Sequence, residues 1–324
     1  MRIFLFFFCL IQTVFGTDYD CLFVGSSPIA LFEAIYQHTS GKKVLIVEQA
    51  NECGGAWKSI AICGISHADL GCHQIGSDPQ LKEFLEIYGG CSLVSLDHPL
   101  SSADLFSGNG YYFSKGCYEL VNHLEQLIEK IGIPLLLNHR VDSIFVDLGE
   151  GHAIVKINGE SLSTKKVFHT SMSSFTIENS KTASSHHISK YPHLYLLIQD
   201  PTPPKFSYMG YGFQGAFRAM NLTHFVDLAH TGRQLVVIQV TAENMLTNGI
   251  KYLEDLKKRN FLDPSAYLLE EHGYTYEILH NSHLIIDPEF RPYFEMIDTA
   301  SFAIMKNSAN KWAQVLRPYR DIIP

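Results

Sequence analysis

The chain has 324 residues, of which 46% are hydrophobic, 12% aromatic and 18% charged. This composition excludes a disordered protein, and the length allows one large hydrophobic core or two moderate ones. The formal net charge of −8 argues against nucleic acid as a partner, because nucleic-acid binding normally needs a basic surface.

The first sixteen residues differ from the rest. After Arg2, residues 3–15 are almost entirely apolar. Val14 and Gly16 then offer modest or small side chains at the two positions that a signal peptidase reads. We predict a signal peptide over residues 1–16, and therefore a secreted or extracytoplasmic protein with no membrane span after its removal. An uncleaved anchor and a mis-set start codon are the alternatives.

Six cysteines follow this segment. An even number of cysteines in an exported protein permits disulfides, and buried packing is the alternative. No two of them have the spacing of a zinc site or of a CxxC redox motif, so the sequence predicts no metal site.

A strand–helix–strand unit is predicted between Tyr19 and Trp57. Residues 19–25 form a short apolar run that ends in glycine, which is typical of a buried parallel strand. Residues 29–39 repeat apolar side chains at helical spacing, and residues 44–47 form a second apolar strand. This order predicts a right-handed crossover with the helix N-terminus beside the glycine turn.

The turn and the acid after the second strand are candidates for binding a dinucleotide. A pyrophosphate needs backbone N–H groups and a helix N-terminus, which Gly25, Ser26 and Ser27 would provide. Glu48 lies 23 residues after Gly25, close to the spacing of about 20 residues at which an acid reaches the ribose hydroxyls. The glycine motif is degenerate, because Ser27 replaces its second glycine. A doubly wound unit that binds no nucleotide is therefore the alternative.

The continuation from Gln49 to Trp57 makes the interpretation more specific. It contains the adjacent pair Gly54-Gly55, followed by Ala56 and Trp57. This segment resembles the flavoproteins of the amine oxidase, protoporphyrinogen oxidase and UDP-galactopyranose mutase group. The resemblance implies FAD as the cofactor, with the paired glycine beside the phosphate and ribityl chain of the flavin.

Four residues farther along the chain enter the site through the same resemblance. Val141 is expected to contact the adenine through its backbone, and Ser171 ends a strand that returns to the cofactor domain. His73 belongs to a loop that resembles one near the flavin ring, and Arg218 stands where relatives often have an arginine near the substrate. His73 and Arg218 are the only catalytic candidates. A loop histidine bonded to backbone and a solvated arginine are the plainer interpretations.

The match weakens towards the C-terminus. Residues 301–310 occupy the place where relatives have a glycine-bearing segment that closes over the flavin, but they contain no glycine. After them we expect only a short helix near residues 311–316.

These elements predict an α/β fold. One part is a Rossmann-like FAD-binding domain with a parallel sheet and a β-meander, and the other is a mixed-sheet α+β substrate domain. We expect the FAD-binding domain at residues 17–75, 116–180 and 291–324, and the substrate domain at residues 76–115 and 181–290.

Three functions remain open from the sequence. The first is an FAD-dependent oxidoreductase that oxidises a small or lipid-like substrate by hydride transfer to the flavin. The second is a non-catalytic or weakly flavin-binding protein that keeps the scaffold as a binding or escort module, because Rab-escort and GDP-dissociation-inhibitor proteins resemble the same fold. The third is a flavoenzyme similar to the UDP-sugar mutases. A small molecule is the expected partner of the enzymes, and the oligomeric state stays open.

Overall fold

A computed structural model describes residues 19–70, 75–76, 78–96, 110–170, 173–180, 187–206, 208–223, 228, 231–280, 286–297 and 302–319. The expected signal segment lies outside these residues. The chain divides into two compact units, the first drawn from residues 1–55, 124–188 and 279–324 and the second from residues 56–123 and 189–278. Within the described residues, no helix combines the length and the apolar character needed to cross a membrane.

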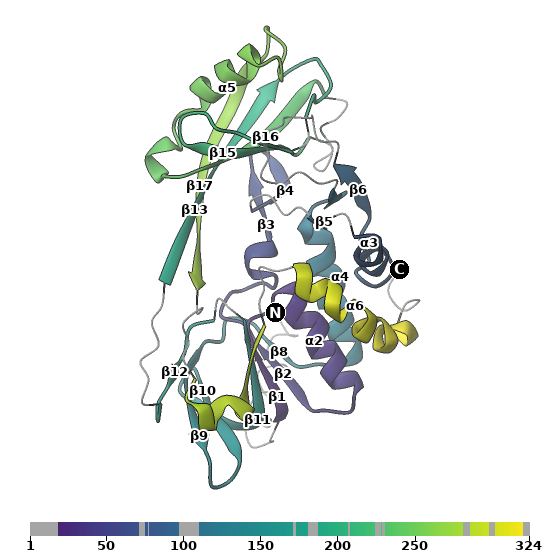
Figure 1. Ribbon diagram of the computed structural model, residues 1–324, viewed down its shortest axis with the longest axis vertical. Helices are drawn as coiled ribbons and strands as arrows, with labels where there is room; N and C mark the ends of the chain where they lie inside the picture. Colours follow the sequence, from purple (N-terminus) through teal and green to yellow (C-terminus); the bar gives the residue numbers. More distant parts are fainter. Residues whose placement is uncertain are drawn as a thin grey trace, which may run out of the picture. The chain divides into compact units, whose positions relative to one another are not determined.

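The first unit is built on an eight-stranded sheet (Figure 1). Its strands follow the order β12-β9-β10-β11-β1-β2-β8, and β18 pairs with β11 beside this path. Strand β1 lies between β2 and β11 and runs parallel to both, while β9, β10 and the start of β11 form an antiparallel meander. The strands are β1 (Tyr19–Val24), β2 (Val44–Val47), β8 (Leu135–Leu136), β9 (Val141–Asp147), β10 (His152–Ile157), β11 (Glu160–Thr170), β12 (Thr176–Ile177) and β18 (Phe294–Ile297).

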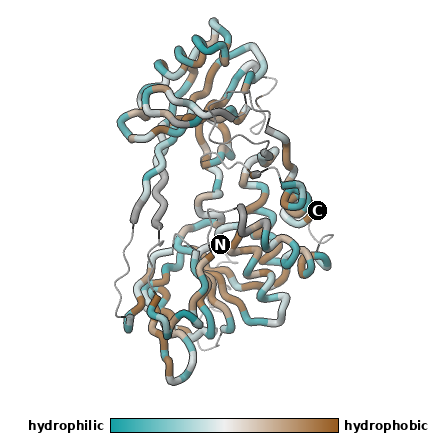
Figure 2. Tube along the Cα trace, in the orientation of Figure 1, coloured by the Kyte–Doolittle hydropathy of each residue, from teal (hydrophilic) through white to brown (hydrophobic). Residues whose placement is uncertain are grey.

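The central strands of this sheet are apolar along most of their length (Figure 2). All four residues of β2 are buried, and five of the six in β1. Such continuous burial is typical of parallel strands that are covered on both faces. One face carries a core that includes Leu22, Leu45 and Val155.

Helices α2 (Pro28–Thr39) and α6 (Phe302–Leu316) pack against each other in the first unit. The ring of Phe32 stacks on Trp312, with centroids 5.2 Å apart. Helix α4 (Cys117–Ile131) passes from the second unit into the first at about Leu124. Short 3-10 turns complete the chain at η1 (Gly55–Trp57), η2 (Glu243–Met245), η3 (Pro288–Tyr293) and η4 (Arg317–Tyr319).

The short helix expected near residues 311–316 was predicted too short. One continuous helix, α6, replaces the expected closing segment and short helix. Its buried residues Met305, Ala309, Trp312 and Leu316 follow each other at steps of four, three and four. This is the helical period, and the helix contains neither glycine nor proline to interrupt it.

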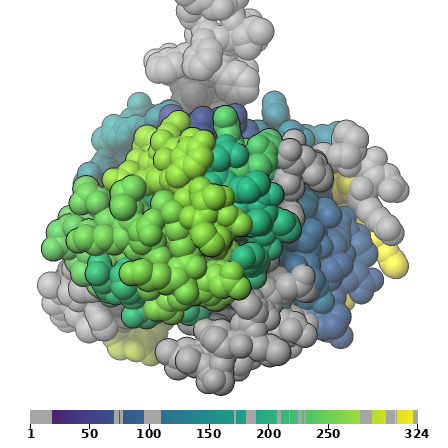
Figure 3. Space-filling model, turned by 90° about the horizontal axis from the view of Figure 1, so that it is seen from above, coloured from purple at the N-terminus to yellow at the C-terminus, as the bar shows by residue number. Residues whose placement is uncertain are grey.

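The second unit is built on a five-stranded sheet of order β14-β15-β16-β13-β17. Helix α5 (Gly249–Lys258) covers one face, where Tyr252, Leu253 and Leu256 join the core. Its atoms, in green, lie on the surface seen in Figure 3. The strands are β13 (His187–Gln199), β14 (Tyr208–Gly210), β15 (Ala216–Asn221), β16 (Arg233–Val240) and β17 (Tyr267–His280).

A hairpin packs on the other face of this sheet. Strands β3 (Ser59–Ile62) and β4 (Ile65–Asp69) form the hairpin and bury Ile62 and Ala68 against Tyr195 and Val237 of the sheet. A three-stranded sheet and one helix complete the unit: β5 (Ile75–Gly76), β6 (Leu93–Leu96), β7 (Gly110–Phe113) and α3 (Pro79–Tyr88). Together the two units confirm the predicted α/β fold class, with a Rossmann-like parallel sheet and meander and a second, mostly antiparallel sheet.

Candidate cofactor site

The turn between β1 and α2 has the conformation that its glycine allows. Gly25 has φ +98°, and its N–H donates to the carbonyl of Val47 at 2.8 Å. A Cβ at this position would lie 2.6 Å from Thr170 Oγ1. Gly25 is therefore required by close packing within the unit as well as by its backbone conformation.

Ser27 begins helix α2. It is the N-cap, its Oγ accepts a hydrogen bond from Ala30 N–H at 3.3 Å, and Pro28 follows at the first helical position. A serine cap and an N1 proline are typical helix starts. Ser27 thus has a local role at the position where a dinucleotide motif has its second glycine, and its Cβ stands at the positive end of the helix dipole.

The carboxylate of Glu48 is fixed by its own chain. One oxygen, Oε2, accepts the Ser26 N–H at 3.0 Å and the Ser26 hydroxyl at 2.7 Å, and Oε1 accepts the N–H of Ala50 at 2.9 Å. Glu48 and Ser26 are both buried. The acid that is expected to meet a ribose is therefore oriented towards the turn in advance, and only its remaining lone pairs are open to a ligand.

The glycine pair is joined to the same turn. Gly54 donates its N–H to the carbonyl of Ser26 at 3.0 Å, and Gly54 and Gly55 have φ +107° and +57°. A Cβ on Gly55 would meet no atom within 4 Å, so the outer side of the pair is open to an approaching group. The neighbouring Cys53 thiol is hydrogen-bonded to Ser26, and burial raises its pKa to about 12, which keeps it neutral.

The segment before β9 also reaches this cluster. The N–H of His139 donates to the carbonyl of Glu48 at 2.9 Å, and the N–H of Asn138 donates to that of Ala50 at 2.8 Å. Val141 follows two residues later, with its side chain buried in the core. The backbone around Val141 therefore adjoins the end of β2.

The structure thus brings together most of the expected cofactor residues of the first unit. Gln49 is exposed beside Glu48. After Gly55 the chain enters the second unit, where Ala56 is half-buried and Trp57 is buried. The Trp57 ring lies edge-on to Phe113, with the ring centroids 6.3 Å apart. Their cofactor roles stay predictions. His73 and Ser171 lie outside the described residues.

Asp69 organises the second unit and was missed by sequence reasoning. Its carboxylate accepts the hydroxyls of Tyr112 and Ser59 and the N–H of Cys117, which opens helix α4. Its backbone carbonyl accepts the hydroxyl of Tyr195 at 2.7 Å. A carboxylate at a helix N-terminus is stabilised by the dipole. The sequence contains one signal that a distant residue caps α4: the helix begins after a glycine, with no capping side chain next to it.

Arg218 is hydrogen-bonded within the sheet, and its role at the substrate stays a prediction. On strand β15 it is partly buried, and its Nε donates to Oε1 of Gln239 on β16. Gln239 is fully buried, and its Nε2 has no hydrogen-bond partner among the described residues. His193 of β13, also buried, stands opposite Gln239 in the register. The sheet therefore carries a polar group of three side chains, of which Gln239 and His193 are buried.

The comparisons with known proteins rest on structure. No protein-family model and no curated protein sequence matches the chain. Putrescine oxidase, solved with putrescine bound, superposes with a TM-score of 0.64 at 11% identity and covers 94% of this chain and 99% of its own. Reduced UDP-galactopyranose mutase gives a TM-score of 0.60 at 12% identity, with 93% and 86% covered.

The chain has the fold of the amine-oxidase-like flavoproteins. The same fold is found in a Rab GDI from Plasmodium falciparum, at a TM-score of 0.56 and 10% identity, with 93% of this chain and 98% of that chain covered. The amine-oxidase-like fold therefore carries different functions, and the function must be argued from the site.

Proposed function

We propose that the protein is an FAD-dependent oxidoreductase that oxidises a small or lipid-like substrate. The observation that carries this proposal is the backbone-bonded cluster of Gly25, Ser26, Glu48 and Gly54 at the N-terminus of α2. This is the arrangement that a dinucleotide requires, because it combines a helix N-terminus, a close turn and an acid at the end of the second strand.

The residues fit FAD in distinct roles. The dipole of α2 and the backbone at Ser27 would hold the pyrophosphate, because the N–H groups of Gly25 and Ser26 already donate to Val47 and Glu48. Glu48 would accept from the ribose hydroxyls through its remaining lone pairs. The open side of Gly55 would let the ribityl chain pass. When bound, the flavin supplies a ring that accepts a hydride from the substrate, and the protein supplies orientation and exclusion of water.

The polar group of Arg218, Gln239 and His193 in the second unit supports a substrate with a polar end. Gln239 Nε2 is a buried donor without a partner among the described residues, and such a donor costs free energy until an acceptor binds it. The fixed Arg218 beside it provides positive charge. We infer that this face of the sheet holds an oxygen-bearing or anionic group of the substrate, with Arg218 as a binding residue. His73 stays a proposed polar contact near the ring.

The first test is the visible spectrum of the purified protein. We expect the paired absorption bands of oxidised flavin, either as purified or after addition of FAD. A folded, colourless protein that ignores FAD would exclude both flavoenzyme hypotheses. Substrate-dependent bleaching without any sugar isomerisation would then separate an oxidoreductase from a mutase.

A second test uses the open side of the glycine pair. Gly55→Asn keeps the left-handed backbone, which asparagine tolerates, and places a side chain where the ribityl chain would pass. We expect loss of flavin with an unchanged circular-dichroism spectrum. The matched control is Gly151→Asn, because Gly151 in the β9–β10 turn has φ +72° and also has nothing within 4 Å of its Cβ position. Equal flavin retention by both variants would place the cofactor elsewhere.

A binding module without catalysis is the second candidate. The observation that favours it is that both oxygens of Glu48 are already bound within the chain, and the Rab GDI shows that the fold occurs outside the oxidases. A colourless protein would favour this candidate.

The proposed extracytoplasmic location is checked by the N-terminal sequence of the protein recovered from its host.

A further inference from the structure

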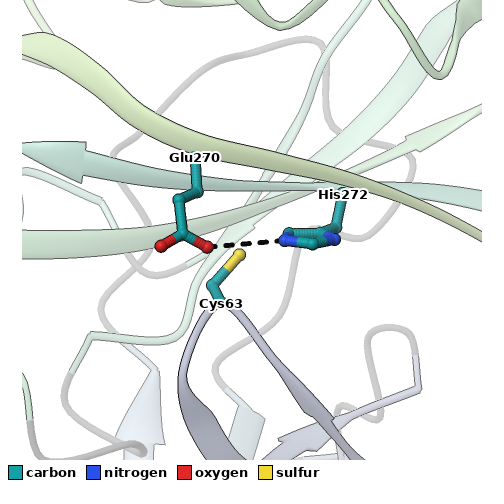
Figure 4. A group of neighbouring side chains, drawn as sticks. All are labelled: Cys63, Glu270 and His272. Atoms are coloured by element: carbon teal, nitrogen blue, oxygen red, sulfur yellow. Dashed lines mark hydrogen bonds and ion pairs between the residues drawn. The ribbon is translucent and has the colours of Figure 1, made fainter.

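Three side chains with metal-binding atoms meet in the second unit (Figure 4). The Sγ of Cys63, a carboxylate oxygen of Glu270 and a ring nitrogen of His272 all lie within 4.8 Å of one another. His272 Nε2 is 3.4 Å from Glu270 Oε2. The thiol is buried, while the carboxylate and the imidazole are exposed.

The cysteine is held in place by a tight turn. Cys63 and Gly64 form the two-residue loop between β3 and β4, with φ +51° and +71°. Hairpin loops with two positive φ angles favour Asn, Asp or Gly, so a cysteine at the first position is an unusual choice. The hairpin buries Cys63 with Leu197 of the sheet and with Leu222, which follows β15. The thiol therefore has a defined position.

The other two groups are brought together by strand β17. Glu270 and His272 are two residues apart in an extended strand, so their side chains leave it on the same face. Figure 4 shows both directed towards Cys63. The intervening Glu271 lies on the opposite face of the strand, next to helix α5. Its carboxylate is so close to Gly249 of α5 that a Cβ there would collide with it. Strand β17 is also the edge of its sheet, and Glu270 and His272 are both exposed, so an ion from solvent can reach them.

We propose that Cys63, Glu270 and His272 form a binding site for Zn²⁺ or a similar borderline divalent cation. Thiolate, imidazole and carboxylate are together the ligand set of zinc, whereas Mg²⁺ and Ca²⁺ prefer oxygen alone. Three protein ligands leave a fourth position open to water or to another ligand. This site is independent of the flavin proposal, and the two stand or fall separately.

The distances allow the ion to bind with side-chain movement alone. Zinc bonds of about 2.3 Å to sulfur and about 2.0 Å to nitrogen put these atoms about 3.5 Å apart in a tetrahedron. The histidine–glutamate separation is already of this size. Exposed side chains change rotamer readily, so Glu270 and His272 can close the remaining ångström or so towards the fixed sulfur.

Binding of the metal requires the Cys63 thiol to lose its proton. Burial, followed by the charge of Glu270, raises the pKa of the Cys63 thiol to about 11. At neutral pH the free thiol is therefore protonated and a poor nucleophile, and binding of a cation would displace its proton. One consequence of binding is a link between the β3–β4 hairpin and the edge strand β17.

The test is a titration of the tag-free, chelator-treated full chain with Co²⁺, followed by competition with Zn²⁺. We expect one ion per chain, a sulfur-to-cobalt charge-transfer band, displacement of the band by Zn²⁺, and a higher melting temperature with zinc. Cys63→Ser should abolish the band. His272→Asn and Glu270→Gln, both at exposed positions that tolerate change, should weaken binding by about tenfold or more.

The matched control is Glu271→Gln, which removes the same charge from the opposite face of β17 and should bind cobalt as the unaltered chain does. Persistence of the band in Cys63→Ser would overturn the proposal. So would equal binding by the unaltered chain and by a triple variant at the three positions, because the ion would then occupy other histidines or cysteines. Flavin content, measured on the same samples, is expected to be unchanged throughout.

Discussion

Ser26 donates both its backbone N–H and its hydroxyl to the same carboxylate oxygen of Glu48, at 3.0 and 2.7 Å. The turn expected to meet a pyrophosphate and the acid expected to meet a ribose are thus one hydrogen-bonded unit before any ligand arrives. Such an arrangement preorganises the acid but uses part of its acceptor capacity. If the proposed function holds, the affinity for FAD depends on how closely the pyrophosphate can approach the backbone at residue 27.

Ser27→Gly is expected to tighten FAD binding. The change removes the one Cβ that stands at the second glycine position of the motif, and glycine as N-cap costs only a few tenths of a kcal/mol relative to serine. Flavin-fluorescence quenching measures the affinity. Ser27→Ala is the control, since it keeps the Cβ and loses the cap, at about 1 kcal/mol of stability. Equal affinities of the two variants would show that the pyrophosphate does not approach this residue.

Glu33→Ala is expected to release helix α6 from α2. The buried carboxylate of Glu33 accepts Lys311 Nζ at 2.8 and 2.9 Å, Trp312 Nε1 at 2.9 Å and Gln37 Nε2 at 2.7 Å. Removing it leaves these donors without their acceptor, at a cost of about 3 kcal/mol. Hydrogen exchange in α6 measures the release. Trp312→Phe keeps the stacking on Phe32 and should have a smaller effect; the reverse order would contradict the central role of the carboxylate.

His169 is expected to make the fold sensitive to acid. Burial between Phe175 and Phe294 lowers its pKa to about 4, despite a contact with the Thr170 backbone that raises it. The unfolded chain takes up this proton near pH 6.5 and the folded chain near pH 4, so the stability from the neutral ring is complete above pH 6.5 and declines towards pH 4. The full loss is about 3 kcal/mol.

Denaturation curves at a series of pH values test this expectation. His169→Phe should flatten the decline between pH 6.5 and pH 4, because phenylalanine fits the aromatic surroundings and binds no proton. His152→Phe, at a partly exposed position on β10, is the control and should keep the slope. An unaltered slope in His169→Phe would mean that other groups cause the acid sensitivity.

Gly116→Ala is expected to cost more stability than Gly132→Ala. The two glycines flank helix α4 with φ +79° and +80°, so the backbone strain is alike. At Gly116 a Cβ would also lie 2.7 Å from Asp69 Oδ1, whereas at Gly132 it meets nothing within 4 Å. The strain is about 1 kcal/mol for each, and displacing the Asp69 carboxylate should add 1 kcal/mol or more, roughly. Thermal unfolding compares the two; equal melting temperatures would mean that Asp69 moves without cost.

The local part of the fold was predictable from sequence because its signals are local. The apolar strands β1 and β2, the helical period of α2 and the turn at Gly25 are all readable within thirty or so residues. The β-meander, to which β9 and β10 belong, was also among the predicted elements. The full length of α6 was missed because the family resemblance suggested a closing segment at residues 301–310, where the apolar residues in fact repeat at helical spacing.

The polar contacts between distant segments were not predictable. Asp69 caps a helix that begins 48 residues later, and Gln239 meets Arg218 only through the pairing of β15 with β16. Cys63 and His272 are brought together by the packing of the β3–β4 hairpin on the five-stranded sheet, which no spacing rule describes. Sequence patterns report burial and period, and they do not report which polar side chains face each other across a fold.

The pairing of β18 with β11 has a consequence for synthesis. The first unit needs segments from both sides of the second, and its sheet and its α2–α6 contact are complete only after residue 316 has emerged. The second unit needs nothing beyond residue 278. We therefore expect the second unit to fold first on the ribosome. The first unit pairs strands that are far apart in the sequence, so we expect it to fold slowly and only after helix α6 has been translated.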